Sequence, residues 1–204
     1  MNAIFLGSFD PPHLGHANVI MSVINSDISK LINNIHIIPT KQNPNKKSST
    51  PILYRYYMSK LMFEPLSTED TNVIVNDIEF KHDWTYTYDM LEYLANDNDK
   101  SIGKDFLWII TRETYGELIN NKWYKSEDIF SKYITKMIIV GSKPEMDIYP
   151  DNVWCRQYIQ LMPGINIHST DIRNLIKQNK NVELYFNNGV YNIIKENNLY
   201  GYKK

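Results

Sequence analysis

Short runs of β-branched and other apolar residues alternate along this chain with segments of helical periodicity, and this alternation most strongly limits the fold. The apolar runs are Ala3–Leu6, Ile35–Ile38, Val73–Val75, Phe106–Ile110 and Met137–Val140. Helical patterns lie between them, at roughly 16–25, 54–66, 88–96 and 115–120. Such alternation predicts an α/β fold, a doubly wound parallel sheet with helices on both faces. Active groups are then expected at the carboxyl ends of the strands.

The pattern changes after Val140. An irregular stretch runs to Pro163, and two short helical segments follow, one ending near Gln178 and one over roughly 190–197. We expect a single domain over residues 1–204, a length that suits one sizeable α/β unit. Residues 1–144 would form the core, and residues 145–204 a small C-terminal helical part.

The first sixteen residues, MNAIFLGSFDPPHLGH, place a small-residue turn and two histidines directly after an apolar strand. Gly7 and Ser8 end the strand, and His13 and His16 stand at the head of an amphipathic segment. A strand, a turn and a helix N-terminus aim backbone N–H groups at one spot, where an anion binds. Two imidazoles facing that spot would add donors whose charge changes near neutral pH, so a polyphosphate is the expected ligand.

This opening resembles that of the HxGH nucleotidyltransferases, whose signature is G-[ST]-F-D-P-x-H-x-G-H. Eight residues stand in register with it: Gly7, Ser8, Phe9, Asp10, Pro11, His13, Gly15 and His16. The resemblance implies a Rossmann-like fold. It also implies that Gly7, Ser8, Phe9 and both histidines contact ATP, with His16 closest to the transferring phosphorus.

A second segment, reading I-H-S-T-D-I-R over residues 167–173, resembles the I-S-[ST]-T-x-I-R signature of the same family. Ser169 or Thr170 is predicted to cap a helix, with Arg173 one turn in. Taken alone, the segment is an ordinary capped helix with a surface arginine. Together with the first motif, the resemblance implies that Ser169, Thr170 and Arg173 hold the β- and γ-phosphates of ATP.

Further segments are similar to the nicotinate mononucleotide adenylyltransferases in particular. Residues 39–46 resemble their P-x-x-x-P-P-H-[KR] loop, residues 54–58 their H-R-x-x-M helix start, and residues 85–91 their S-Y-T-x-[DQ]-T-L segment. Trp123-Tyr124 resembles their P-x-W-x pair. The resemblance implies that Trp123 stacks on the pyridine ring and that backbone near Thr87 and Tyr124 meets the nicotinate carboxylate. Lys46 would close over the phosphates from its loop.

The chain departs from that family at several places. Asn45 stands where the loop has a histidine. The fourth strand ends in Thr111-Arg112-Glu113 where the family has G-x-D, so Thr111 replaces a glycine that lets backbone approach the nucleotide. Glu113, one methylene longer than aspartate, is expected to contact ATP on its ribose side. Lys143 stands where the family often has arginine, near the adenine end.

The resemblance implies transfer of AMP from ATP to nicotinate mononucleotide. Mg²⁺ would be carried on the ATP phosphates, and we expect no protein metal site. His13, His16 and Arg173 are the expected catalytic residues, because this step needs positioning and charge neutralisation rather than a protein nucleophile. Two alternatives stay open: an adenylyltransferase of the same fold for nicotinamide mononucleotide or phosphopantetheine, and a non-catalytic nucleotide sensor that binds ATP without turnover.

Composition limits the partners. A formal net charge of −1 and a pI of about 6.5 argue against whole-surface attraction to nucleic acid or anionic membrane. The expected partners are therefore ATP and a pyridine mononucleotide, with no nucleic acid and no membrane, and a homodimer stays open. The chain starts directly in a strand without a leader pattern, and its single cysteine, Cys155, cannot form an internal disulfide. We therefore expect a cytoplasmic location.

Overall fold

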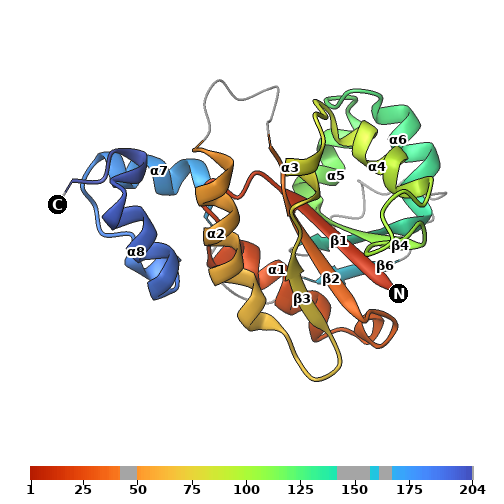
Figure 1. Cartoon of the computed structure of the whole chain (residues 1–204), viewed down its shortest axis with the longest axis horizontal. Helices are drawn as coiled ribbons and strands as arrows, with labels where there is room; N and C mark the ends of the chain where they lie inside the picture. The colour runs from red at the N-terminus through yellow and green to blue at the C-terminus, as the bar shows by residue number, and fades with distance from the viewer. Residues whose placement is uncertain (42–49, 142–156, 161–166, 204) are drawn as a thin grey trace.

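The computed structural model describes residues 1–41, 50–141, 157–160 and 167–203. Among these residues, six strands form one sheet in the order β3-β2-β1-β4-β5-β6, and every neighbouring pair is parallel. The strands are β1 (Asn2–Gly7), β2 (Asn34–Pro39), β3 (Asn72–Val75), β4 (Phe106–Thr111), β5 (Met137–Gly141) and β6 (Gln157–Gln160). The predicted doubly wound α/β fold is confirmed (Figure 1).

The strand order reverses at β1, which pairs with β2 on one side and with β4 on the other. The chain therefore leaves the carboxyl ends of β1 and β4 in opposite directions, and in sheets of this kind ligands bind in a crevice between the two loops that follow. Gly7 ends β1, Pro39 ends β2 and Thr111 ends β4, all at the same edge of the sheet. This edge is where the predicted site residues of the first motif lie.

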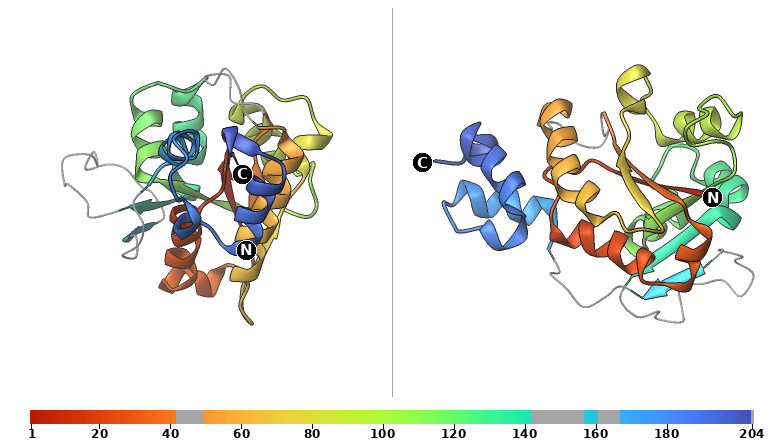
Figure 2. Two further views of the ribbon diagram at one scale, coloured as in Figure 1. Left: turned by 90° about the vertical axis from the view of Figure 1, so that its left-hand side faces the viewer. Right: turned by 60° about the horizontal axis from the view of Figure 1, so that its bottom comes forward.

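Helices cover both faces of the sheet (Figures 1 and 2). One face carries α1 (Leu14–Ile24) and α2 (Ile52–Phe63). The other carries α3 (Ile78–Lys81), α4 (Thr87–Ala95), α5 (Arg112–Ile119) and α6 (Ser126–Tyr133). Alternate strand residues face opposite sides, so Phe5 and Ile37 enter the core under α1 and α2, whereas Ile4 and Trp108 enter the core under α4 to α6. Strands buried on both faces read as continuous apolar runs, as they do in this sequence.

The C-terminal helices form a block at one end of the molecule, beside α2 (Figure 1). This block contains α7 (Ser169–Lys177), α8 (Asn188–Glu196) and two 3-10 helices, η5 (Glu183–Tyr185) and η6 (Leu199–Gly201). The Asn187 side chain donates to the carbonyl of Leu61 at 2.6 Å, and the Tyr54 hydroxyl lies 3.2 Å from Asn197 Oδ1. Val190 and Ile194 are fully buried against the α1–α2 core. The apolar stripe predicted for the last helix is therefore confirmed.

Several element boundaries differ from the prediction. Residues 157–160 form the edge strand β6, although the sequence suggested irregular structure up to Pro163, and α6 was not predicted. The first helix begins at Leu14 rather than at His16, because His13 serves as its N-cap. Short 3-10 helices complete the connections: η1 (Asp27–Leu31), η2 (Glu64–Leu66) and η3 (Ile134–Lys136).

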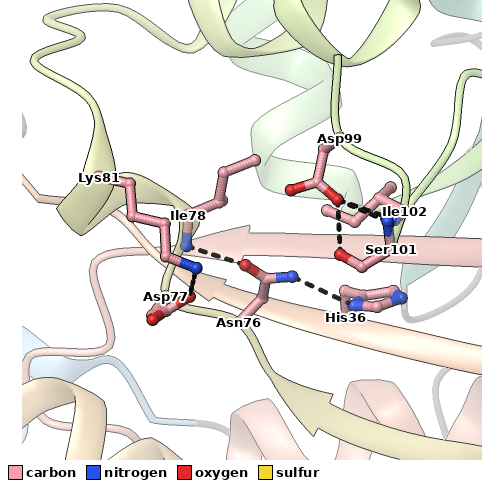
Figure 3. Close-up of polar contacts among 8 residues, drawn as sticks. All are labelled: His36, Asn76, Asp77, Ile78, Lys81, Asp99, Ser101 and Ile102. Atoms are coloured by element: carbon pink, nitrogen blue, oxygen red, sulfur yellow. Dashed lines mark hydrogen bonds and ion pairs between the residues drawn. The ribbon is translucent and has the colours of Figure 1, made fainter. Parts of the chain in front are cut away.

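A buried histidine in β2 belongs to the framework of the fold. His36 is 3% exposed, and its Nδ1 lies 3.4 Å from the side-chain nitrogen of Asn76, whose oxygen accepts the N–H of Ile78 at 2.8 Å (Figure 3). Burial lowers the pKa of His36, and this effect outweighs the opposing charge of Asp99. His36 is thus a neutral group that links β2 to the start of α3.

No helix among the described residues is long and apolar enough to cross a membrane.

Candidate active site

Two imidazoles are locked together at the start of α1. The N–H of Gly15 donates to His13 Nδ1 at 3.1 Å, and the N–H of His13 donates to His16 Nδ1 at 3.3 Å. This reciprocal cap satisfies backbone donors that the first helical turn leaves without partners. The two rings lie 3.8 Å apart between centroids, tilted by 35°. Because each Nδ1 accepts, the proton of each neutral ring lies on Nε2, so Nε2–H is the donor each offers to a ligand.

The electrostatics of His13 differ from the expectation. Its side chain is 3% exposed, and burial lowers its pKa to about 4, with a smaller contribution from the charge of His168. The prediction that both imidazoles change charge near neutral pH is therefore wrong for His13. At pH 7 this residue is a neutral, fixed hydrogen-bond donor.

Gly7 and Phe9 shape the turn before α1. Phe9 has a φ of 44° and is 2% exposed, and its ring folds back over Gly7. A Cβ on residue 7 would stand 2.8 Å from that ring, so glycine is required there. The Phe9 ring meets the His16 ring edge-on at 5.2 Å between centroids. Phe9 thus supports His16 by packing, and its expected contact with ATP is not through an exposed side chain.

A buried arginine, Arg55, ties the loop after β1 to both ends of the segment between β2 and α2. Its guanidinium is 1% exposed and donates to the carbonyls of Ser8 at 2.6 Å, Thr40 at 2.7 Å, Lys41 at 2.9 Å and Thr50 at 2.8 Å. These carbonyls follow β1, follow β2 and precede α2. The sequence placed Arg55 in a helix-start motif, but nothing in that pattern revealed its role as the link between these loops.

The second motif docks directly on the first. Ser169 Oγ donates to the carbonyl of Pro11 at 3.0 Å, and Arg173 Nη1 donates to the carbonyl of Asp10 at 2.7 Å. Arg173 Nη2 also donates to Thr170 Oγ1 at 3.0 Å, within α7. Residues more than 150 positions apart in the chain are thus hydrogen-bonded at the loop that leads to the two histidines.

A second connection from the C-terminal block reaches the same loop. Asp10 is 5% exposed; its Oδ1 accepts the hydroxyl of Tyr200 at 2.8 Å, and its Oδ2 accepts the N–H of Thr50 at 3.3 Å. Burial, followed by the charge of Asp10, raises the pKa of Tyr200 well above its usual range. Tyr200 therefore remains a neutral donor. The sequence motifs gave no indication of this role for Tyr200.

The N-terminus of α7 carries a third histidine. His168, rather than the predicted Ser169 or Thr170, is the N-cap residue of this helix. Its Nδ1 lies 3.8 Å from Glu113 Oε2. The sequence string around Ser169 already contained this histidine, but its position as the cap was not foreseen, because hydroxyl side chains are the more common caps.

The departure at the end of β4 has a local explanation. Thr111 is the N-cap of α5, and its Oγ1 accepts the N–H of Thr114 at 3.2 Å. Threonine thus satisfies a backbone donor of the first helical turn, which a glycine cannot do with a side chain. The same short helix holds Glu113, whose side chain is 69% exposed and points to His168 rather than into the core.

The residues expected to bind the pyridine lie on the α4–α6 side of the sheet. Thr87 is the first residue of α4, and Tyr86, immediately before it, stacks on Tyr124 with 4.2 Å between ring centroids. Trp123 is half-buried as expected, and its Nε1 donates to Glu117 at 2.8 Å. The α4 start and the segment before α6 are therefore brought together, and Tyr124 remains 48% exposed.

Some expectations fall outside the described residues. Lys46 and Asn45 belong to residues 42–49, and Lys143 and Cys155 to residues 142–156, which the structure does not describe. Within the described ranges, no group of three or more His, Cys, Asp or Glu side chains is placed to hold a metal ion. Near the site, Asp10 is occupied by Tyr200 and Thr50, and Glu113 by His168.

The geometry is that of an anion site at a sheet edge. The helix α1 begins directly after the loop of residues 10–13, and the N-terminus of α7 packs against the same loop. Partial positive charge accumulates where helix N-termini meet. His13 and His16 stand at the start of α1, and Ser169, Thr170 and Arg173 stand in the first turns of α7, which is docked on the same loop. A polyphosphate matches this set of donors better than a single carboxylate does.

Comparison with known proteins supports the same conclusion. Residues 4–175 match the family model described as cytidylyltransferase-like. A probable nicotinate-nucleotide adenylyltransferase of Caldicellulosiruptor bescii is 29% identical over 206 residues, covering 97% of each chain. That of Clostridium kluyveri is 30% identical over 213 residues, covering 97% of this chain and 98% of the relative.

The fold has close relatives among solved structures. The nicotinic acid mononucleotide adenylyltransferase of Plasmodium falciparum, complexed with NaAD, matches with a TM-score of 0.74 at 19% identity, covering 99% of this chain and 98% of that one. At this identity the match shows a shared architecture over the full length. The family model and the 30% identical relative identify the family. This chain belongs to the cytidylyltransferase-like family and to the nicotinate-nucleotide adenylyltransferases that match it along nearly its whole length.

Proposed function

We propose that this chain transfers the adenylyl group of ATP to nicotinate mononucleotide, giving nicotinate adenine dinucleotide and pyrophosphate in NAD biosynthesis. The observation that carries the proposal is the docking of α7 on the loop of residues 10–11, which brings Arg173 and Ser169 next to the imidazole pair. The names of the curated relatives support the choice of nicotinate mononucleotide as acceptor.

In the proposed reaction, the 5′-phosphate of the acceptor attacks the α-phosphorus of ATP in line. The bond from the α-phosphorus to the bridging oxygen breaks, and pyrophosphate leaves with that oxygen. The attacking group is already an anion, so the protein supplies alignment and stabilises the charge that develops. His16 donates from Nε2 to the α-phosphate, and His13 donates beside it as a neutral group. Ser169, Thr170 and Arg173 hold the departing pyrophosphate.

The acceptor would lie against the α4–α6 side. Trp123 offers the face of its indole to the electron-poor pyridine ring, and its bond to Glu117 fixes the indole's orientation. Backbone N–H groups near Thr87 and Tyr124 would receive the nicotinate carboxylate. Glu113 would meet ATP at the mouth of the crevice, and the backbone of Gly7, Ser8 and Phe9 would border the phosphates.

Mg²⁺ enters the proposal as part of the substrate, MgATP. The nearest acidic side chains are engaged with protein partners, a donor set that suits an ion held mainly by phosphate oxygens and water. When bound, the ion would neutralise charge on the triphosphate. Lys46 would add a cation from its loop. A cytoplasmic location, with ATP and a pyridine mononucleotide as partners, belongs to the same proposal, and assembly into a homodimer stays open.

The test supplies purified protein with MgATP and one of three acceptors: nicotinate mononucleotide, nicotinamide mononucleotide or phosphopantetheine. Pyrophosphate release is measured for each. We expect the highest kcat/KM with nicotinate mononucleotide. Preference for either other acceptor would overturn the substrate assignment, and ATP binding without pyrophosphate release from any acceptor would favour a nucleotide sensor.

A further inference from the structure

An exposed contact between a histidine and a carboxylate links the starts of α7 and α5. His168 at the start of α7 and Glu113 at the start of α5 approach to 3.8 Å, with side chains 63% and 69% exposed. Exposed pairs of this kind contribute little to stability, roughly 0–1 kcal/mol. The pair joins two helices that start at the same edge of the sheet, so its position suggests a role in the site rather than in the fold.

His168 is electrostatically part of the imidazole cluster. Its charge contributes to lowering the pKa of His13, so the two rings lie within range of each other. The surrounding charges come from three elements: Glu113 and Arg112 on α5, His13 and His16 at the start of α1, and Asp171 and Arg173 on α7 itself. Asp171 accepts the backbone N–H of His168 at 3.3 Å. Three of the chain's five histidines therefore gather at one place.

Both partners of this pair also differ from the signatures quoted above, as Asn45 and Thr111 do. His168 stands where the I-S-[ST]-T-x-I-R pattern has serine, and Glu113 stands where the strand-end pattern has the shorter aspartate. A longer carboxylate on α5 and an imidazole on α7 can meet across the crevice, whereas a serine at residue 168 would leave a gap. The chain thus carries two matched changes on opposite sides of one site.

We propose that His168 is a third imidazole of the triphosphate site and that Glu113 is its resting partner, which the triphosphate displaces. The proposal rests on the proposed function in so far as the crevice binds the tail of ATP. In the empty site, the Glu113 carboxylate occupies the position of a phosphate oxygen beside His168. An entering polyanion repels Glu113 and takes over His168, which then donates to a phosphate oxygen.

This exchange predicts effects of opposite sign at the two positions. Inorganic tripolyphosphate with Mg²⁺ is the probe, because it carries no ribose that Glu113 could contact, and binding is measured by calorimetry. His168→Ser keeps a hydroxyl helix cap and should weaken binding by about 5-fold. Glu113→Gln removes the competing carboxylate and should tighten binding by about 3-fold. In the double variant, the gain from Glu113→Gln should disappear, because the imidazole that Glu113 restrained is absent.

A pH comparison separates an electrostatic role from a structural one. An electrostatic role predicts that lowering the pH from 8 to 6 tightens tripolyphosphate binding by a larger factor in the intact chain than in His168→Ser. The His168→Ser variant is the reference for protonation of tripolyphosphate itself, because this protonation affects both proteins equally. Lys177→Ser, at the exposed far end of α7, is the matched control and should behave as the intact chain.

The outcomes are decisive in both directions. Unchanged tripolyphosphate binding in His168→Ser would overturn the proposal that the triphosphate displaces Glu113 from His168. An equal gain in affinity from Glu113→Gln in the intact chain and in His168→Ser would overturn it as well. These binding arms need no turnover, so they stand even if no acceptor yields pyrophosphate. Conversely, normal adenylyl transfer together with equal tripolyphosphate affinity in all the variants would reject the role of His168 and leave the proposed function intact.

Discussion

The N-termini of α1 and α7 meet at one loop, yet they present imidazoles in opposite ways. At α1, His13 is buried, neutral and fixed by a reciprocal cap with His16. At α7, His168 is exposed and paired with a carboxylate from another helix. A fixed neutral donor suits the position next to the reacting phosphorus, since it needs no reorganisation during the reaction. At α7, an exposed imidazole that can exchange its carboxylate partner for a phosphate suits the end of the triphosphate that leaves as pyrophosphate.

The largest expected effect removes a fixed donor. His16→Ala should lower kcat about 100- to 1,000-fold, the usual scale for deleting one preorganised donor, because in the proposed reaction His16 donates to the α-phosphate. Turnover is measured by pyrophosphate release with nicotinate mononucleotide. The ion-pair variant His168→Ser should lower kcat far less. Equal losses in the two variants would remove the distinction between the two N-termini.

The second effect concerns the buried state of His13. Its pKa of about 4 in the folded chain lies below the ordinary value of 6.5, so the unfolded chain binds the proton first as the pH falls. Stability is then fully present above about pH 6.5 and declines as the pH falls toward 4, by up to about 3 kcal/mol.

The variant His13→Asn retains a capping acceptor and lacks this titration. Urea unfolding of both proteins between pH 4 and pH 7 measures the difference in slope, and His36 contributes equally to both. Parallel stability curves would show that His13 is not held neutral by burial.

A smaller effect is expected from the link between the C-terminal block and the loop. Tyr200→Phe removes the hydroxyl that donates to Asp10, at a cost of about 1.5 kcal/mol for a hydrogen bond to a charged group. Thermal unfolding measures the loss. KM for ATP should rise at the same time, since Asp10 also accepts from Arg173 through its carbonyl. A variant with lower stability and unchanged KM would make this link purely structural.

The smallest effect tests the third helix N-terminus, that of α5. Thr111→Ala should cost about 1 kcal/mol of stability, because the side chain caps the helix, and Thr111→Ser should recover most of it. Chemical denaturation of the three proteins is the measurement. If alanine is as stable as threonine, the cap does not explain why this chain departs from glycine at residue 111.

The fold could be predicted from the sequence because strands buried on both faces leave a plain signal. Phe106–Ile110 and Met137–Val140 are continuous apolar runs, and each forms a strand. The edge strand β6 has no such signal, since only Ile159 of its four residues is a long aliphatic one. The helix α6 mixes charged residues with a few apolar ones, and its segment is short.

Only the residues of the site that lie in recognisable sequence motifs could be predicted. The strings around His13 and Arg173 predicted which residues belong together, and α7 indeed docks on the loop before α1. The protonation of His13 could not be predicted, because it depends on burial by the complete fold. Arg55 and Tyr200 act through backbone carbonyls and through Asp10, contacts that no local spacing encodes.

The most direct test of the shared triphosphate site is nuclear magnetic resonance of the chain with ¹⁵N-labelled histidines, titrated with Mg²⁺ and α,β-methylene ATP. We expect His13 to give the signals of a neutral Nε2–H ring at pH 7 and to shift together with His16 and His168 as one saturable event. His36, which lies within the fold, should remain unchanged. A shift at only one of the two helix N-termini would contradict a single triphosphate site formed by both α1 and α7.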